Sequence, residues 1–387
     1  MIKKTAFGSL ILLMIVMAIA TMVEKWFGTD TAHAAIYGSP WFVALWGICG
    51  VVSLVYVNQQ LGAGVWRRKR GSRMHKGFGV RGLHIAFFII LLGAFITYLT
   101  ADRGYVHIRQ GEKVHFYISE EGAEKRSLPF DIKLLLFDIE YHAGTDEPAD
   151  YISFLKVNDE VQQVSMNKIL KRDGYRFYQM DFDSDEMGTT LLVSHDPWGI
   201  GITYTGYFLL GLAMIVLLFQ RIGWKGVLAV LVPLAGLWYY ISQINPMTPV
   251  LRSPMLAAHV SVIMLSYGLL LAMMVFSIVA LSSKRLSHKF YRWNTALLYP
   301  AVFFLATGIF IGAVWANISW GRYWGWDAKE TWALITLLVY ALPFHKTSLS
   351  WFRHERNFHW FCVIAFLTIL MTFFGVSYVL GGIHSYV

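Results

Sequence analysis

Apolar residues along the chain gather in long runs separated by polar segments. A helix that crosses the hydrocarbon core of a bilayer needs roughly 20 apolar residues, and about nine runs approach that length. The first run is predicted to be a retained helix, because it ends too far before the small-residue sequence at Ala32 to Ala34 for a signal peptide. The pattern therefore predicts transmembrane helices, the eighth of them short, at residues 5–23, 41–61, 82–100, 201–220, 226–243, 256–281, 294–316, 331–345 and 359–380.

One polar stretch interrupts these runs between the third and the fourth. Its segments "KVHFYI", "DIKLLLFDIEYH", "YISFLKV", "YRFYQMDF" and "TTLLVSH" are rich in aromatic and β-branched residues, and Asp173-Gly174 is a hairpin dipeptide. We therefore expect an all-α polytopic membrane protein with a small extracytoplasmic β domain inserted between helices 3 and 4. The predicted domains are 1–100, 101–200 and 201–387.

Composition and charge fix the class and the orientation. Hydrophobic residues make up 56% of the 387 residues and charged residues only 15%, which is typical of membrane proteins. With a cytoplasmic N-terminus, the loop "WRRKRGSRMHKGFGVR" and the other basic loops lie inside, and Glu355 is the one acidic residue among them. The C-terminus then lies outside. The net charge of +9 reflects this topology and gives no reason to invoke nucleic acid.

Four histidines fall at two matching depths of the predicted helices. His84 and His345 lie at inner helix ends, whereas His259 and His384 lie at outer ones. A histidine inside a membrane segment suggests a functional site. Paired imidazoles without a cluster of acids or cysteines suit an iron porphyrin better than zinc or calcium. A lone histidine at a helix end is more often an interface residue, but the two-and-two arrangement favours ligation. Three further inner histidines are interpreted as solvated or headgroup-facing: His288, His354 and His359.

The sequence "WGRYWGWDAKETW", residues 320–332, concentrates aromatic side chains at the outer level. One interpretation is an interfacial aromatic belt, with Asp327 and Glu330 as a capping box for the next helix. A belt, however, does not require four tryptophans in one loop. Trp320 and Trp324 are four residues apart, so a helical turn would place them on one face, and Trp326 follows. Three basic residues are predicted to pair with porphyrin propionates: Arg252, Arg322 and Lys329.

These residues resemble a known family. "WGRYWGWDAKETWALITLLVYALPFH" is similar to the tryptophan-rich (WWD) signature of heme-handling proteins of cytochrome c biogenesis. "MTPVLRSPMLAAHVSVIMLSYG" and "GGIHSYV" resemble the flanking histidine segments of the CcsA branch. "YGSPWFVALW", "RGLHIAFFIILLGAF" and "YRFYQMDFDSDEMGTTLLVSHDPWG" resemble the ResB (CcsB) family. The chain departs from the family in a shorter outer β insert and in Ala328, which replaces the proline that usually follows the WWD aspartate.

The resemblance implies a compact, fused system II cytochrome c synthase in a bacterial inner membrane. It implies ResB-like helices in 1–100 and CcsA-like helices in 201–387, with the WWD loop at about 315–330. It implies an inner heme site at His84 and His345 and an outer one at His259 and His384. The WWD residues Trp320, Trp324, Trp326 and Asp327 would present heme b to the CxxCH thiols of apocytochrome c. Thioredoxin-like thiol reductants are implied as further partners.

Two other functions remain open at the level of sequence. One is a heme exporter or chaperone that makes no covalent bond. The other is a transmembrane redox protein whose two hemes pass electrons across the bilayer. The residues themselves predict two levels of histidine ligands, but they do not supply the thioether chemistry.

Overall fold

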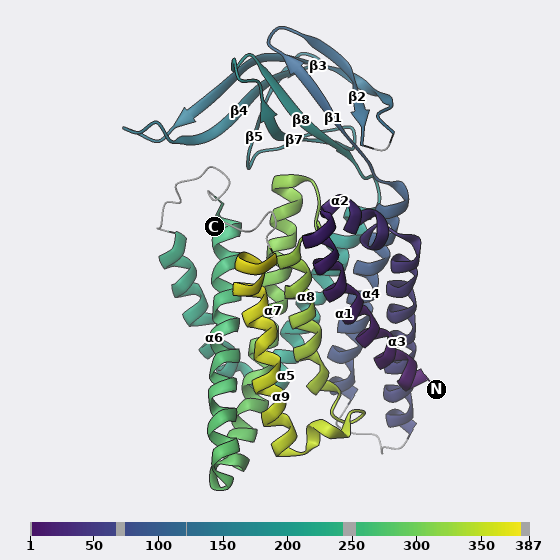
Figure 1. Cartoon of the computed structure of the whole chain (residues 1–387), viewed down its shortest axis with the longest axis vertical. Helices are drawn as coiled ribbons and strands as arrows, with labels where there is room; N and C mark the ends of the chain where they lie inside the picture. The colour runs from purple at the N-terminus through teal and green to yellow at the C-terminus, as the bar shows by residue number, and fades with distance from the viewer. Residues whose placement is uncertain (1, 67–73, 121, 243–252, 381–387) are drawn as a thin grey trace.

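A bundle of long helices carries a folded β-sheet at one end (Figure 1). The computed structural model describes residues 2–66, 74–120, 122–242 and 253–380. Before the sheet lie α1 (Ile2–Phe27), α2 (Thr29–Ala32), the π-helical turn η1 (His33–Tyr37), α3 (Pro40–Trp66) and α4 (Met74–Thr100). After it lie α5 (Gly199–Ser242), α6 (Pro254–Ser282), α7 (Lys284–Trp320), α8 (Ala328–Ala341), the 3-10 turns η3 (Leu342–His345) and η4 (Ser350–Arg353), α9 (Glu355–Leu370) and the π-helix η5 (Met371–Leu380).

Seven of the described helices are long and apolar enough to cross a membrane, so the protein is a multi-pass membrane protein. The runs predicted at 201–220 and 226–243 are two helices that meet at Gly223, where the backbone leaves the helical conformation, and both carry the label α5. The run at 331–345 forms α8 and η3 and is short, as predicted: the 14 residues of α8 extend only about 21 Å at a rise of 1.5 Å per residue, less than the roughly 30 Å hydrocarbon core.

The β domain is one eight-stranded antiparallel sheet with the strand order β5-β4-β3-β2-β1-β8-β7-β6. Strands that are neighbours in sequence pair with each other, except for β5 and β6 at the two edges, and β1 pairs along its whole length with β8. The Ser165–Lys168 bridge and the Arg172–Glu160 ion pair hold the two edge strands close together. The strands are β1 (Asp102–Arg109), β2 (Lys113–Ser119), β3 (Lys125–Tyr141), β4 (Pro148–Val157), β5 (Glu160–Ser165), β6 (Leu170–Arg172), β7 (Tyr175–Phe182) and β8 (Gly188–His195).

The prediction of an all-α fold with a small β insert is therefore wrong. All eight strands contribute to one buried core, which includes Ile108, Leu134, Val164 and Phe177. A curled sheet encloses such a core without any help from helices, so the insert is a substantial folded domain. The hairpin at Asp173-Gly174 is confirmed: both residues have positive φ angles, 48° and 83°, and they join β6 to β7.

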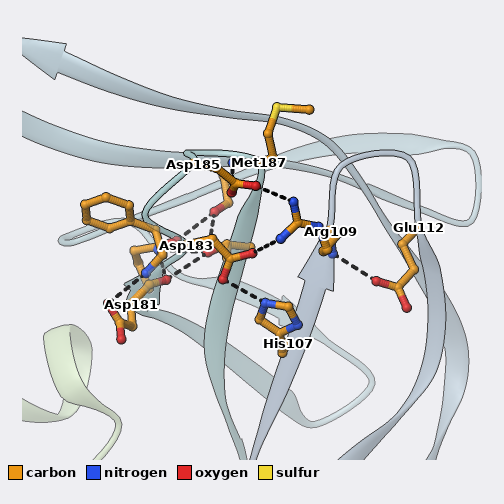
Figure 2. A network of polar contacts seen from close by, with 11 residues as sticks. His107, Arg109, Glu112, Asp181, Asp183, Asp185 and Met187 are labelled. Carbon is orange, nitrogen blue, oxygen red and sulfur yellow. Dashed lines mark hydrogen bonds and ion pairs between the residues drawn. The ribbon is translucent and has the colours of Figure 1, made fainter.

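A polar network lies on the surface of this domain, where β1 faces the hairpin between β7 and β8 (Figure 2). Arg109 binds Asp183 and Asp185, with N–O distances of 2.7 and 2.5 Å, and Nε2 of His107 lies 2.9 Å from Asp183. The Arg109 guanidinium holds the pKa of the Asp185 carboxyl below its usual range. The network therefore joins β1 to the loop between β7 and β8.

The β domain is attached to the helices by contacts with the end of α7. Asn317, buried on α7, accepts hydrogen bonds from Arg176 Nη1 of β7 (3.1 Å) and from the Tyr204 hydroxyl of α5 (3.3 Å). Ser319 lies 3.4 Å from Asn167 of the β domain. These contacts place the sheet directly over the loop that follows α7.

Candidate functional site

A cavity of about 280 Å³ lies where α6, α7, α8 and η5 approach the loop between α7 and α8. His259, Trp320, Trp324, Lys329 and Glu330 line it, together with mainly apolar residues. Ligand sites are typically apolar cavities with a few convergent polar groups. This cavity combines one imidazole, two indoles and a pair of opposite charges, which suits a flat apolar ligand that also carries charge.

His259 is oriented in the cavity by a second helix. Its Nδ1 lies 2.7 Å from the carbonyl oxygen of Gly308 on α7, and this bond requires the proton on Nδ1. Nε2 is then the nitrogen with a lone pair. Histidine metal ligands in proteins almost always have their other ring nitrogen hydrogen-bonded in this manner. The lone pair of His259 is therefore on Nε2, as in histidines that bind metals through this nitrogen.

The two predicted inner histidines lie together at the opposite end of the bundle. The ring centroids of His84 on α4 and His345 in η3 are 6.0 Å apart, with the rings nearly perpendicular. Their Nδ1 atoms lie 2.9 and 3.3 Å from the carbonyl oxygens of Val80 and Ala341. Each of these carbonyls is four residues earlier in sequence. Both inner imidazoles thus have the same tautomer as His259.

Trp320, Trp324 and Trp326 of the WWD loop face two directions. Helix α7 ends at Trp320, because Gly321 adopts a left-handed conformation with φ 74°. No helical turn joins Trp320 to Trp324, yet both line the cavity. Trp326 instead stacks on Tyr37 of η1, with ring centroids 5.0 Å apart and an interplanar angle of 11°. Trp326 therefore packs against the N-terminal segment of the chain.

Asp327 forms the N-cap of α8. Its side chain accepts from the backbone N–H groups of Lys329 (2.8 Å) and Glu330 (3.3 Å). Glu330 in turn accepts from the N–H of Gly325 at 2.7 Å. The carboxylates of Asp327 and Glu330 thus tie the loop to the first turn of α8. Asp327 therefore has a structural role as a helix cap.

Of the predicted cationic residues that the structure describes, one lines the cavity and one does not. Lys329 lines the cavity, whereas Arg322 is exposed and its guanidinium covers Gly325, 3.4 Å from the position of an added Cβ atom. Arg252 and His384 lie outside the described residues. Tyr323, which the sequence analysis did not select, also lines the cavity and donates to the carbonyl of Ile200 at 3.1 Å. Burial raises the pKa of the Tyr323 phenol far above its usual range, so the phenol stays protonated.

His359 corrects one interpretation of the inner histidines. Its side chain is fully buried, and its ring nitrogens lie 3.2 Å from Ser277 Oγ and from the Ser287 carbonyl oxygen. It is therefore a hydrogen-bonded packing residue between helices and is not headgroup-facing. His288 is exposed and pairs with Glu355 at 2.6 Å.

Comparison with known proteins assigns the two parts of the chain. Residues 194–384 match the family described as "Cytochrome C assembly protein", and residues 69–202 match the ResB-like family. Protein NrfI of Wolinella succinogenes is 37% identical over 171 residues, which cover 40% of this chain and 19% of NrfI. Cytochrome c biogenesis protein CcsA of Chlamydomonas reinhardtii is 35% identical over 157 residues, covering 38% of this chain and 44% of CcsA. CcsA of Atropa belladonna is 31% identical over 192 residues, covering 39% and 61%.

A ResB-like region followed by a cytochrome c assembly region defines a class of membrane proteins of cytochrome c biogenesis. The chain belongs to this class as a fused ResB/CcsA protein of system II. It spans less than two thirds of the length of the curated relatives that it matches, between 19% and 61% of the three described here.

Proposed function

We propose that this protein moves heme across the membrane and attaches it to the CxxCH sequence of an apocytochrome c. The observation that carries the proposal is the arrangement of histidines at two levels. His84 and His345 are adjacent at one end, and His259 lies in an aromatic cavity at the other. In all three, Nδ1 is bonded to a backbone carbonyl, so the lone pair that iron ligation requires is on Nε2.

In this proposal His84 and His345 receive heme b at the cytoplasmic side. His259 and His384 then hold the iron at the outer side, beside Trp320 and Trp324. Lys329, Arg322 and Arg252 are proposed to pair with the propionates by charge-assisted hydrogen bonds. Trp326 and Asp327 act by holding the loop in place. The β domain and the C-terminus face outward, and the N-terminus is cytoplasmic, in a bacterial inner membrane.

The covalent step adds each cysteine thiol of CxxCH across one heme vinyl group. The sulfur bonds to one vinyl carbon and hydrogen is added to the other, so no net oxidation or reduction takes place. Both cysteines must be thiols for this addition, and for that reason thioredoxin-like reductants are proposed as partners. The contribution of the protein is to bind and orient heme, which itself supplies the reactive vinyl groups.

The proposal is tested by co-expression with a c-type cytochrome in cells that lack a maturation system of their own. A synthase yields cytochrome with covalently attached heme, detected by heme staining after denaturing electrophoresis. A heme exporter or a transmembrane redox protein yields none. His259→Ala is the matched variant, and it should abolish the product while the protein still accumulates. Purified protein that contains no heme after heme-replete expression would refute the proposal in all its forms.

A further inference from the structure

His259 packs against a glycine pair on the neighbouring helix. Gly308 and Gly312 of α7 are four residues apart and therefore share one face of the helix. A methyl group on Gly312 would lie 2.6 Å from His259 Nδ1, and one on Gly308 would lie 2.6 Å from Ile263 Cδ1, one turn further along α6. Both glycines thus face α6, as in helix pairs that approach closely through small residues.

We infer that Gly308 and Gly312 are positioning residues that fix the tautomer and the orientation of the His259 imidazole. The inference rests on the proposed function, in which His259 ligates heme iron. Gly312 leaves the space that the ring occupies, and the Gly308 carbonyl accepts the Nδ1 proton at 2.7 Å. A hydrogen bond at this nitrogen orients a ligand imidazole and makes it more basic, so it also tunes the bound iron.

The outer ligand differs in this respect from the inner pair. His84 and His345 bond to carbonyls of the turn that precedes them, so each ring is held by its own stretch of chain. His259 bonds to another helix, and its pose therefore depends on the separation of α6 and α7. The same helix α7 ends at Trp320 and is tied to the β domain through Asn317. A shift of α7 would therefore move Trp320 and the His259 ring together.

A close approach of two helices through glycines could also serve packing alone. The two explanations differ in what a methyl group on Gly312 encounters. The atoms nearest to it are Nδ1, Cε1 and Cγ of His259, at 2.6, 2.7 and 3.3 Å, and all three belong to the imidazole. The harm caused by Gly312→Ala should therefore depend on the presence of the ring. Gly268→Ala is the matched control on α6, because its methyl group would meet no atom within 4 Å.

The experiment compares Gly312→Ala in the wild-type and in the His259→Ala background. Full-length protein is purified, and its yield, its heme per protein, its absorption spectrum and the reduction potential of the bound heme are measured. In the wild-type background Gly312→Ala should lower heme per protein to about the level of His259→Ala, change the spectrum as His259→Ala does, and make the potential of any remaining outer heme more positive. In the His259→Ala background it should change nothing by more than about twofold, since the residues are then uncoupled. Gly268→Ala should match the wild type.

Equal losses in both backgrounds would overturn the inference, because they would show a role in helix packing. So would wild-type heme content and spectrum in Gly312→Ala. If Gly312→Ala protein fails to accumulate, the double variant decides: recovery of the protein supports a clash with the ring, and continued absence refutes it. If His259→Ala alone leaves heme content and spectrum unchanged, the ligand assignment of the proposed function fails as well. If only His259→Ala has an effect, the glycine inference alone fails.

Discussion

The stacking of Trp326 on Tyr37 gives a sharp test of how the N-terminal helices hold the WWD loop. Tyr37 is 5% exposed, its ring is parallel to the indole, and its hydroxyl lies 3.4 Å from Thr331 Oγ1 on α8. Tyr37→Phe removes only the hydroxyl and should cost about 0.5–1.5 kcal/mol of stability. Tyr37→Ala removes the ring as well and should cost about 3–5 kcal/mol.

The interaction itself is measured by a double-mutant cycle with Trp326→Ala. An aromatic pair contributes about 0.5–1.5 kcal/mol beyond the area it buries, so the double variant should be more stable than the sum of the single losses predicts by about 1 kcal/mol. The assay is reversible unfolding in mixed micelles followed by far-ultraviolet circular dichroism, with heme content measured in parallel. Both single variants should also retain less heme, because Trp326 immediately precedes the Asp327 cap.

A matched pair on the helices separates loop placement from general stability. Phe276 and Phe290 stack at 5.1 Å with an angle of 13°, on α6 and α7. Phe290→Ala should lower stability and leave heme retention per folded protein unchanged. The reasoning is refuted if the losses at Tyr37 and Trp326 add within about 0.5 kcal/mol, the range found for independent sites.

Three further predictions follow from the described contacts. Asp327→Ala should cost about 0.5–2 kcal/mol as a lost N-cap, whereas Asp327→Asn should recover most of that stability; a denaturation series on both variants checks this. Asn317→Ala should leave the helices folded and make the β domain more accessible to protease, because the Arg176 and Tyr204 bonds are lost; unchanged cleavage rates would contradict it. Arg109→Ala should raise the pKa of Asp185. Since the folded pKa of Asp185 is depressed, its stabilisation is present above the unfolded pKa, about 3.9, and is lost as pH falls through the folded value. The difference between wild type and variant should therefore be seen near neutral pH, shrink in acid and diminish in high salt.

The transmembrane segments could be predicted from sequence because an apolar run long enough to span a bilayer has few other stable environments. The edge strands could not. β6 has three residues, and β5 reads "EVQQVS", so neither carries a strand pattern of its own. Each forms a strand only because it pairs with β4 or β7. That pairing depends on the tertiary structure and not on the local sequence.

The candidate site could likewise be predicted from the sequence only in part. Residue counting along helices gives the depth of a histidine, but it does not give the side of the helix that faces a partner. The 6.0 Å approach of His84 and His345 therefore had to come from the structure. Tyr37 was missed because it lies in a short π-helical turn whose conformation depends on its contacts. Trp326 was grouped with Trp320 and Trp324, although it stacks on Tyr37 and is not among the residues that line the cavity.

The pairing of β1 with β8 affects how the chain can vary. The β domain leaves the bundle at the end of α4 and returns at the start of α5, and these two points are bound together by Thr97 Oγ1 and Asp196 Oδ2 at 2.7 Å. Its two ends are adjacent strands in full register. For the helical bundle, the whole β domain is therefore an insertion at a single position, between α4 and α5. Only β1 and β8 connect the domain to α4 and α5, so we expect that the number of strands between them can change while the two helices keep their positions.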